Sequence, residues 1–238
     1  MTARELRLGQ APARMVCNGA PESAARRGTI LLYHGFTADS RASLPELQRL
    51  ADAGFVALGI DAVGHGARRY PDFARRFPER WSEQAAHEFY GVVEQTTAEV
   101  PHLVHELVAR GWCHDGRLGL AGISMGAFIC YGAVLAEPRI EAVVANIGSP
   151  RWRLSPERSP HLHPKRFFPV ALLSQIAQND SVVPLGPALE LHEQLRPCYR
   201  DAPQRLRLVQ IPDADHIMPA VDWESVTANM VDWFTRFL

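Results

Sequence analysis

A serine flanked by glycines lies between a strand-like segment and a helix-like segment. The run 122–126 reads Gly-Ile-Ser-Met-Gly, follows residues 117–121 and precedes the apolar residues 127–135. A tight strand-turn-helix connection holds its central residue in a strained backbone, so its neighbours must be very small. The turn exposes the hydroxyl at the carboxyl edge of a sheet, close to a helix N-terminus that favours developing negative charge. The sequence therefore predicts that Ser124 is a nucleophile.

Strand-like and helix-like segments alternate along the chain, which favours a mainly parallel sheet covered by helices on both faces. After an edge hairpin at 5–8 and 14–17, the expected strands are 29–33, 55–60, 117–121, 141–147, 169–177 and 206–211. The expected helices are 44–53, 83–110 with an interruption near Pro101, 127–135, 185–195 and 223–237. Because no repeat or linker divides this α/β pattern, we expect one domain over residues 1–238.

The composition excludes several classes of protein. The 238 residues are 47% hydrophobic and 21% charged with a formal net charge of -1, so no nucleic-acid or membrane partner is expected. No apolar run approaches the roughly 18 residues of a spanning helix, and the N-terminus lacks the apolar region of a secretion signal. The four cysteines (Cys17, Cys113, Cys130 and Cys198) form no Cys-x-x-Cys pair. They predict reduced thiols and a cytoplasmic protein.

A serine hydroxyl is a weak nucleophile, so it needs a general base and a third group that orients this base. His216 follows the last expected strand and precedes the last expected helix, which is the position of a loop at a strand's carboxyl end. By contrast, His161 and His163 lie in an irregular segment, and His192 is explained as a residue on a solvated helix face. The sequence therefore predicts that His216 is the base.

The orienting acid must lie on another strand end, between the serine and the histidine in the chain. Asp180 follows the strand-like run 170–177 and precedes a helix, and its alternative role is to cap that helix. Asp201 precedes its strand and so lies at the opposite edge of the sheet. Asp213 and Asp215 are too close in sequence to the histidine to reach its far ring nitrogen, so we expect them in the turn. Asp180 is therefore the predicted acid.

Two backbone N–H groups are expected to bind the oxygen that gains charge during acyl transfer. One belongs to Met125, the residue after the nucleophile, and the other to Phe36, in the loop after the first buried strand. Gly35 is expected to permit close approach of the backbone there. His34 and His65 lie in two loops of the same edge, and we interpret both as structural histidines.

Two irregular segments, 67–81 and 149–168, follow strand ends, where lids and substrate walls are common. We predict that they cover the pocket and restrict the size of the acyl group, because their aromatic side chains would otherwise be exposed. The candidate substrate-binding residues are Phe73, Phe77, Trp81 and Trp152. The five arginines of the first segment fit a solvated surface or a cationic clamp for a charged substrate.

Five motifs in order resemble the α/β-hydrolase superfamily. They read Leu-Tyr-His-Gly-Phe at 32–36, Gly-His-Gly at 64–66, Gly-Ile-Ser-Met-Gly-Ala at 122–127, Asn-Asp-Ser-Val-Val-Pro at 179–184, and histidine at 216. Within the superfamily the chain resembles small bacterial serine esterases near the dienelactone-hydrolase and prolyl-oligopeptidase-like branch. The resemblance implies an eight-stranded, mainly parallel sheet and hydrolysis of carboxylic esters without a cofactor. Dienelactone hydrolases proper use a cysteine nucleophile, so Ser124 argues against a dienelactone substrate.

The leading hypothesis is a serine carboxylesterase that acts on small or medium esters. A thioesterase or acyl transferase would use the same acyl-enzyme, and the sequence does not separate these activities because the shape of the pocket decides. A non-catalytic binding protein is less favoured, because binding alone does not need three such residues on three strand ends. The pairs His102/His105 and His161/His163 lack a carboxylate partner, and no nucleotide-binding motif occurs, so we expect neither a metal nor a nucleotide cofactor. The sequence gives no oligomeric state.

Overall fold

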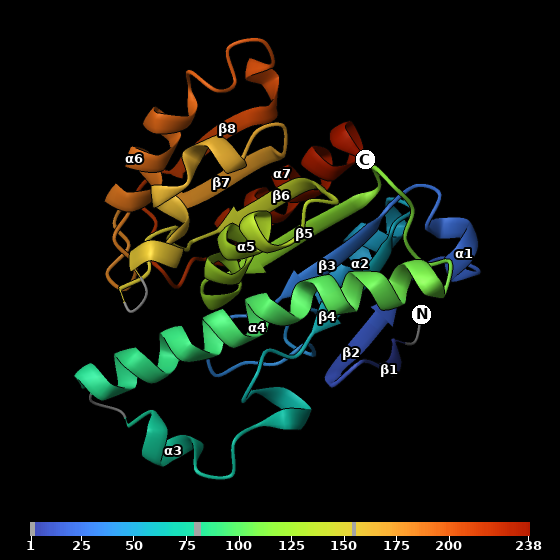
Figure 1. The fold of residues 1–238 in the computed structure, drawn as a ribbon, viewed down its shortest axis with the longest axis horizontal. Helices are drawn as coiled ribbons and strands as arrows, with labels where there is room; N and C mark the ends of the chain where they lie inside the picture. The colour runs from blue at the N-terminus through green and yellow to red at the C-terminus, as the bar shows by residue number, and fades with distance from the viewer. Residues whose placement is uncertain (1–2, 79–81, 154–155) are drawn as a thin grey trace.

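An eight-stranded sheet forms the centre of the molecule (Figure 1). The computed structural model describes residues 3–78, 82–153 and 156–238. Two strands form the predicted antiparallel hairpin at one edge: β1 (Arg4–Leu8) and β2 (Ala11–Val16). The other six are mutually parallel: β3 (Thr29–Tyr33), β4 (Val56–Ile60), β5 (Leu118–Ile123), β6 (Ile140–Asn146), β7 (Ala171–Ala177) and β8 (Leu206–Ile211). The strand order is β1-β2-β4-β3-β5-β6-β7-β8.

Helices cover both faces of the sheet, because alternate residues of each buried strand point to opposite faces. On one face, α2 (Leu44–Asp52) and α7 (Ala220–Phe237) share an apolar cluster with Ile30 and Leu32 of β3. On the other face, Leu31 and Tyr33 join the cluster of three helices: α4 (Glu83–Ala109), α5 (Met125–Ala136) and α6 (Gly186–Leu195). This arrangement confirms the predicted α/β class (Figure 1).

Short helical segments connect the longer elements. The α-helical ones are α1 (Pro21–Ala24) and α3 (Phe73–Arg76). The 3₁₀ ones are η1 (Gly66–Arg68), η2 (Pro156–Arg158), η3 (Pro160–Leu162), η4 (Pro164–Arg166) and η5 (Pro203–Arg205). Most of them lie in the two irregular segments of the sequence, whose described residues form short helical turns instead of long helices.

The long helix α4 continues through Pro101, so the predicted interruption was wrong. A proline in a helix interior removes one backbone hydrogen bond and its ring crowds the preceding turn. Ten buried residues along α4 pack against the sheet and α5, and such tertiary packing outweighs a local preference. In the described ranges, no helix is both long and apolar enough to cross a membrane.

The carboxyl ends of the six parallel strands meet at one edge of the sheet, which is where open α/β sheets bind ligands. β5, β7 and β8 end there at Ile123, Ala177 and Ile211. The loops after these three strands carry the three residues that the sequence predicts to be catalytic. All three loops therefore begin at the same edge of the sheet.

Candidate active site

Ser124 occupies a strained turn between β5 and α5. Its backbone angles are φ 52 and ψ -113, and its N–H donates a 2.9 Å hydrogen bond to the carbonyl oxygen of Asn146 in β6. A Cβ atom at Gly122 or Gly126 would come closer than 3.0 Å to backbone atoms, for Gly126 those of Tyr33 in β3. The predicted strand-turn-helix connection is therefore confirmed, and the two glycines let the turn pack tightly against its neighbours.

The imidazole of His216 lies between the hydroxyl of Ser124 and the carboxylate of Asp180. Its Nε2 atom is 2.9 Å from Ser124 Oγ, and its Nδ1 atom is 2.9 Å from Asp180 Oδ2 and 3.0 Å from Oδ1. Because an ionised carboxylate can only accept, Nδ1 carries the proton and donates it to Asp180. Nε2 is then the acceptor for the serine hydroxyl, which is the geometry that a general base needs.

Asp180 is held in place from its own loop as well. Its Oδ1 atom accepts hydrogen bonds from the N–H groups of Val182 and Val183, at 2.9 and 2.7 Å. The side chains of Asp180 and His216 are only 3% and 10% exposed, which limits competition from water. Since α6 begins at Gly186, Asp180 does not cap that helix, which was its alternative role.

The other acidic residues near the histidine contribute to the turn. Asp215 accepts a 2.6 Å hydrogen bond from the backbone N–H of His216, and the two ring contacts above both come from Asp180. Asp213 has a left-handed backbone, with φ 55, which aspartate tolerates better than most residues. Both observations agree with the expectation that these two aspartates form the turn.

His192 does not lie on a solvated helix face, so that prediction was wrong. It is buried, its Nε2 atom is 2.8 Å from Ser174 Oγ in β7, and burial lowers its pKa to about 4. Ala188, Leu191 and Leu195 are buried on the same side of α6. The helical spacing of these apolar residues was the signal that places position 192 on the inner face.

His34 and His65 are buried, as expected for structural histidines. The Nε2 atom of His34 accepts a hydrogen bond from Ala62 N–H at 3.0 Å, so its Nδ1 atom donates to the carbonyl oxygen of Gly35 at 2.8 Å. Burial lowers the pKa of both histidines, that of His65 to about 4. These bonds join the loops after β3 and β4 at the edge that carries Ser124.

The two expected oxyanion donors lie in segments next to the serine. Met125 is the first residue of α5, where N–H groups have no acceptor within the helix. A Cβ atom built on Gly35 would lie 3.9 Å from Ser124 Cβ, so the loop that leads to Phe36 passes beside the serine. Both this distance and the 3.7 Å from the same Cβ position to the Ile123 carbonyl oxygen are ordinary van der Waals contacts, so the space at position 35 would also admit a side-chain carbon. The donor roles of Phe36 and Met125 stay predictions.

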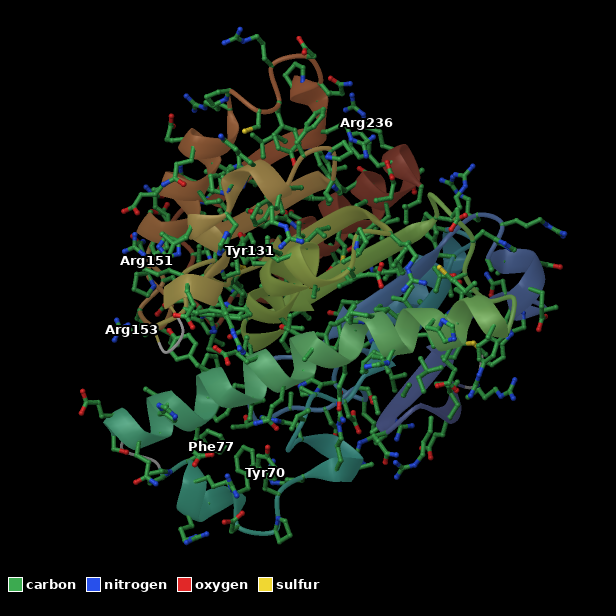
Figure 2. The ribbon with its side chains drawn as sticks, viewed as in Figure 1. Tyr70, Phe77, Tyr131, Arg151, Arg153 and Arg236 are labelled. Carbon is green, nitrogen blue, oxygen red and sulfur yellow. The ribbon has the colours of Figure 1, made fainter. Side chains whose placement is uncertain are left out.

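The aromatic residues of the first irregular segment pack against Phe36. The ring of Phe36 is 5.8 Å from Phe73 and 4.9 Å from Phe77, and both of these side chains are buried. Figure 2 shows Phe77 between α3 and the beginning of α4, with Tyr70 nearby. Trp81 lies outside the described residues. The aromatic side chains therefore line the loop beside the serine, and their contact with substrate stays a prediction.

Trp152, from the second irregular segment, is buried against α5. A Cβ atom at Gly132 would come closer than 3.0 Å to the Trp152 ring, and Thr97 of α4 lies beside the same position. Gly132 is two turns of helix beyond the serine, about 12 Å along α5. The ring thus contributes to packing between helices, and a substrate contact by Trp152 stays a prediction.

Three of the four arginines that the structure describes in the first segment are paired with carboxylates. Arg68 contacts Glu99 at 2.6 Å, and Arg76 contacts Glu88 at 2.7 Å. Asp72 is also bonded to Arg75 and Arg76. These contacts favour the surface interpretation of the segment over a cationic clamp, because a paired guanidinium has fewer free donors for a ligand.

Comparison with known proteins identifies the family. Residues 24–167 match the family described as serine aminopeptidase, S33 (Hydrolase_4). The chain belongs to this family. The matched range of this S33 hydrolase includes Ser124, whereas Asp180 and His216 lie beyond it. The chain is thus an esterase-like hydrolase of the serine type, and the predicted resemblance to α/β-hydrolases is confirmed.

Relatives of this S33 hydrolase extend over the whole fold. "Putative esterase YitV" of Bacillus subtilis is 26% identical, over 88% of this chain and 89% of its own. The crystal structure of TT1662 from Thermus thermophilus is 25% identical with a TM-score of 0.79, covering 98% of this chain and 99% of its own. A dienelactone hydrolase-like promiscuous phosphotriesterase from metagenomic libraries has a TM-score of 0.71 at 14% identity, covering 99% of this chain and 98% of its own. At that identity the likeness concerns the fold alone.

Proposed function

We propose that this protein is a serine carboxylesterase that hydrolyses small or medium uncharged esters through an acyl-enzyme on Ser124. The observation that carries the proposal is the continuous path from Ser124 Oγ through His216 to Asp180, with both contacts at 2.9 Å. A hydroxyl, an imidazole and a carboxylate in this order form the constellation that activates serine for acyl transfer.

In the acylation step, Ser124 Oγ attacks the ester carbonyl carbon while its proton moves to His216 Nε2. Asp180 keeps the proton on Nδ1 and stabilises the imidazolium that forms. The backbone N–H groups of Met125 and Phe36 are the proposed donors to the oxyanion. When the tetrahedral intermediate collapses, the bond to the alcohol oxygen breaks, and His216 returns its proton to the departing alcohol.

In the deacylation step, a water molecule takes the place of the alcohol. His216 Nε2 removes a proton from this water as its oxygen attacks the acyl carbon. The bond to Ser124 Oγ then breaks, the serine recovers the proton, and the carboxylic acid leaves. The two steps together consume one ester and one water and yield one acid and one alcohol, so they require no further reactant.

The surroundings of the triad support an uncharged substrate. Val182 follows Asp180 closely and is 64% exposed, and Ile217 directly follows His216 and is 86% exposed. Val221, at the beginning of α7, is 72% exposed. Exposed aliphatic side chains in the loops of the acid and the base, and at the start of the helix that follows, favour the apolar part of a ligand over a charged group. The arginines of the first irregular segment that pair with carboxylates have few free N–H groups with which to bind a charged ester.

The family description favours a second candidate, an aminopeptidase. Cleavage of an amide needs firmer protonation of a poorer leaving group and closer alignment of the substrate than cleavage of an ester. A thioesterase or acyl transferase would keep the same acyl-enzyme and change only the leaving group or the acceptor. These activities therefore differ in substrate and not in the residues that carry the chemistry.

A side-by-side assay separates these candidates. Purified, metal-free protein is tested on acetyl to octanoyl nitrophenyl esters, an acyl thioester, an amino-acid anilide and nitrophenyl phosphate, with Ser124→Ala as the matched control. We expect kcat/KM to be highest for an ester and the control to be inactive on every substrate. Faster turnover of the anilide, the thioester or the phosphate would contradict the carboxylesterase assignment.

A further inference from the structure

A second carboxylate joins the loop that carries Asp180 to the loop that carries His216. The Oδ1 atom of Asp215 accepts three hydrogen bonds: from Ser181 N–H at 2.8 Å, from Ser181 Oγ at 2.8 Å and from His216 N–H at 2.6 Å. Its Oδ2 atom is 3.1 Å from the same Ser181 hydroxyl. One side chain thus holds the backbone of the residue after the acid and of the base itself.

These contacts begin where the pairing between the two strands ends. β7 and β8 are in register up to Ala177 and Ile211. Beyond that point, two backbone bonds continue between the loops, from Gln178 N–H to Ile211 and from Asn179 N–H to Ala214. Asp215 then supplies the next connection with its side chain, at the position where a strand ladder would otherwise have continued.

The connection through Asp215 affects the position of the general base, His216. The imidazole of His216 must keep one nitrogen on Asp180 and the other on Ser124, at the same time. The rotamer of the side chain alone does not fix both contacts, because they also depend on the position of the backbone that carries the ring. Fixing the His216 N–H relative to Ser181 removes that freedom, and an error of about 1 Å in such geometry costs on the order of a hundredfold in rate.

We propose that Asp215 is a positioning residue that clamps the loop of the acid to the loop of the base and so directs His216 toward Ser124. The proposal rests on the proposed function, in which His216 is the general base. Asp215 bonds the backbone of His216, whereas the ring nitrogens contact Asp180 and Ser124, so Asp215 takes no proton from the substrate. Hydrogen bonds from Ser181 and His216 lower the pKa of its carboxyl, because they favour the ionised form that accepts them.

The three hydrogen bonds to one oxygen allow position to be separated from charge. Asparagine has a single side-chain oxygen, and placing it at the Oδ1 site keeps all three bonds while removing the charge. Alanine removes both the hydrogen bonds and the charge. Asp213 is an exposed carboxylate of the same turn, and no side-chain bond of it is found among the described residues. Asp213→Asn is therefore a matched control for loss of charge.

The experiment measures kcat and KM for the best nitrophenyl ester, and the Nδ1 proton of His216 by NMR on histidine-labelled protein. In Asp215→Ala we expect kcat to fall by about tenfold to a hundredfold with KM little changed, and the hydrogen-bonded Nδ1 proton signal to weaken. Asp215→Asn and Asp213→Asn should keep both kcat and the signal. Because position 215 is exposed, the melting temperature should change little in all three variants.

Two results would overturn the clamp. Asp215→Ala could keep the wild-type kcat and proton signal, or Asp215→Asn could lose as much as Asp215→Ala, which would make charge the cause instead of position. Should Asp215→Ala unfold, Ser181→Ala removes one of the three bonds from the other side and should lower kcat and weaken the proton signal to a smaller extent. Wild-type values of both in Ser181→Ala would then overturn the clamp. A wild-type protein without esterase activity would refute the proposed function, whereas the proton signal still tests the clamp.

Discussion

The Nε2 atom of His216 lies 2.9 Å from the Oγ atom of Ser124, although 92 positions separate the two residues in the chain. Ser124 follows β5 and His216 follows β8, with β6 and β7 between them in the sheet. Neighbouring strands lie about 4.8 Å apart, so the two strand ends are separated by roughly 14 Å. The loops after β7 and β8 must therefore bend back over the edge of the sheet to bring the base to the serine.

Replacement of Asp180 by asparagine should lower kcat by about 10⁴-fold and leave the fold intact, because the amide keeps the shape but favours the wrong tautomer of His216. Asp201→Asn is the matched control, since Asp201 lies in the turn before β8, at the opposite edge of the sheet. Ester turnover and melting temperatures of both variants test this. Wild-type turnover in Asp180→Asn would move the acid role to another carboxylate.

Replacement of Gly126 by alanine should destabilise the protein by about 1–3 kcal/mol, because the new Cβ atom would overlap the backbone of Tyr33. Gly186→Ala is the control: no atom lies within 4 Å of a Cβ there, so we expect no loss and a gain of up to about 1 kcal/mol. Urea unfolding measures both free energies. Equal unfolding midpoints for the two variants would show that the turn tolerates a side chain.

The sequence predicted those features that depend on chain order and local backbone. The positions of Ser124, Asp180 and His216 follow from three strand ends in a fixed order, and the structure brings these side chains together. The continuity of α4 through Pro101 depends on packing against the sheet, which local preference does not contain. The contacts of Asp215 with Ser181 and His216 could not be predicted from the sequence either, because they depend on the distance between two loops that only the folded chain brings together.

Acid should destabilise the protein in a defined range of pH. Burial lowers the pKa of His192 from 6.5 to about 4 in the folded state, so below pH 6.5 the unfolded state binds this proton first. Stability is therefore unaffected above about pH 6.5 and falls between 6.5 and 4, by up to about 1.4 kcal/mol per pH unit for this group.

His192→Gln removes the titrating group and should flatten the dependence of stability on pH. His34 and His65 keep their own contributions in this variant, because burial also lowers their pKa values. Urea unfolding midpoints at pH 7.5, 6 and 5 measure the difference. Parallel pH curves for the wild type and the variant would contradict a buried, neutral His192.

Replacement of Phe77 by leucine should shift the preference of the enzyme toward longer acyl chains. Its ring lies 4.9 Å from that of Phe36, and a smaller side chain leaves room beside the loop that passes the serine. We expect the octanoyl-to-acetyl ratio of kcat/KM to rise by about tenfold, since a methylene or two in an apolar pocket is worth that much.

Phe55→Leu is the matched control for this change in acyl preference. Phe55 is buried directly before β4, at the opposite edge of the sheet, so the same substitution there leaves the pocket unchanged. An unaltered ratio in Phe77→Leu, or an equal shift in the control, would refute the predicted role of the first irregular segment as a wall of the acyl pocket.

The central claim is that Ser124 forms the covalent acyl-enzyme, and labelling with a fluorophosphonate followed by mass spectrometry of the peptides tests it most directly. We predict a single adduct on Ser124, parallel loss of esterase activity, and neither adduct nor activity in a folded Ser124→Ala variant, whose rate should fall by about 10⁴- to 10⁶-fold. An adduct on another residue, or continued ester hydrolysis by Ser124→Ala, would contradict the account.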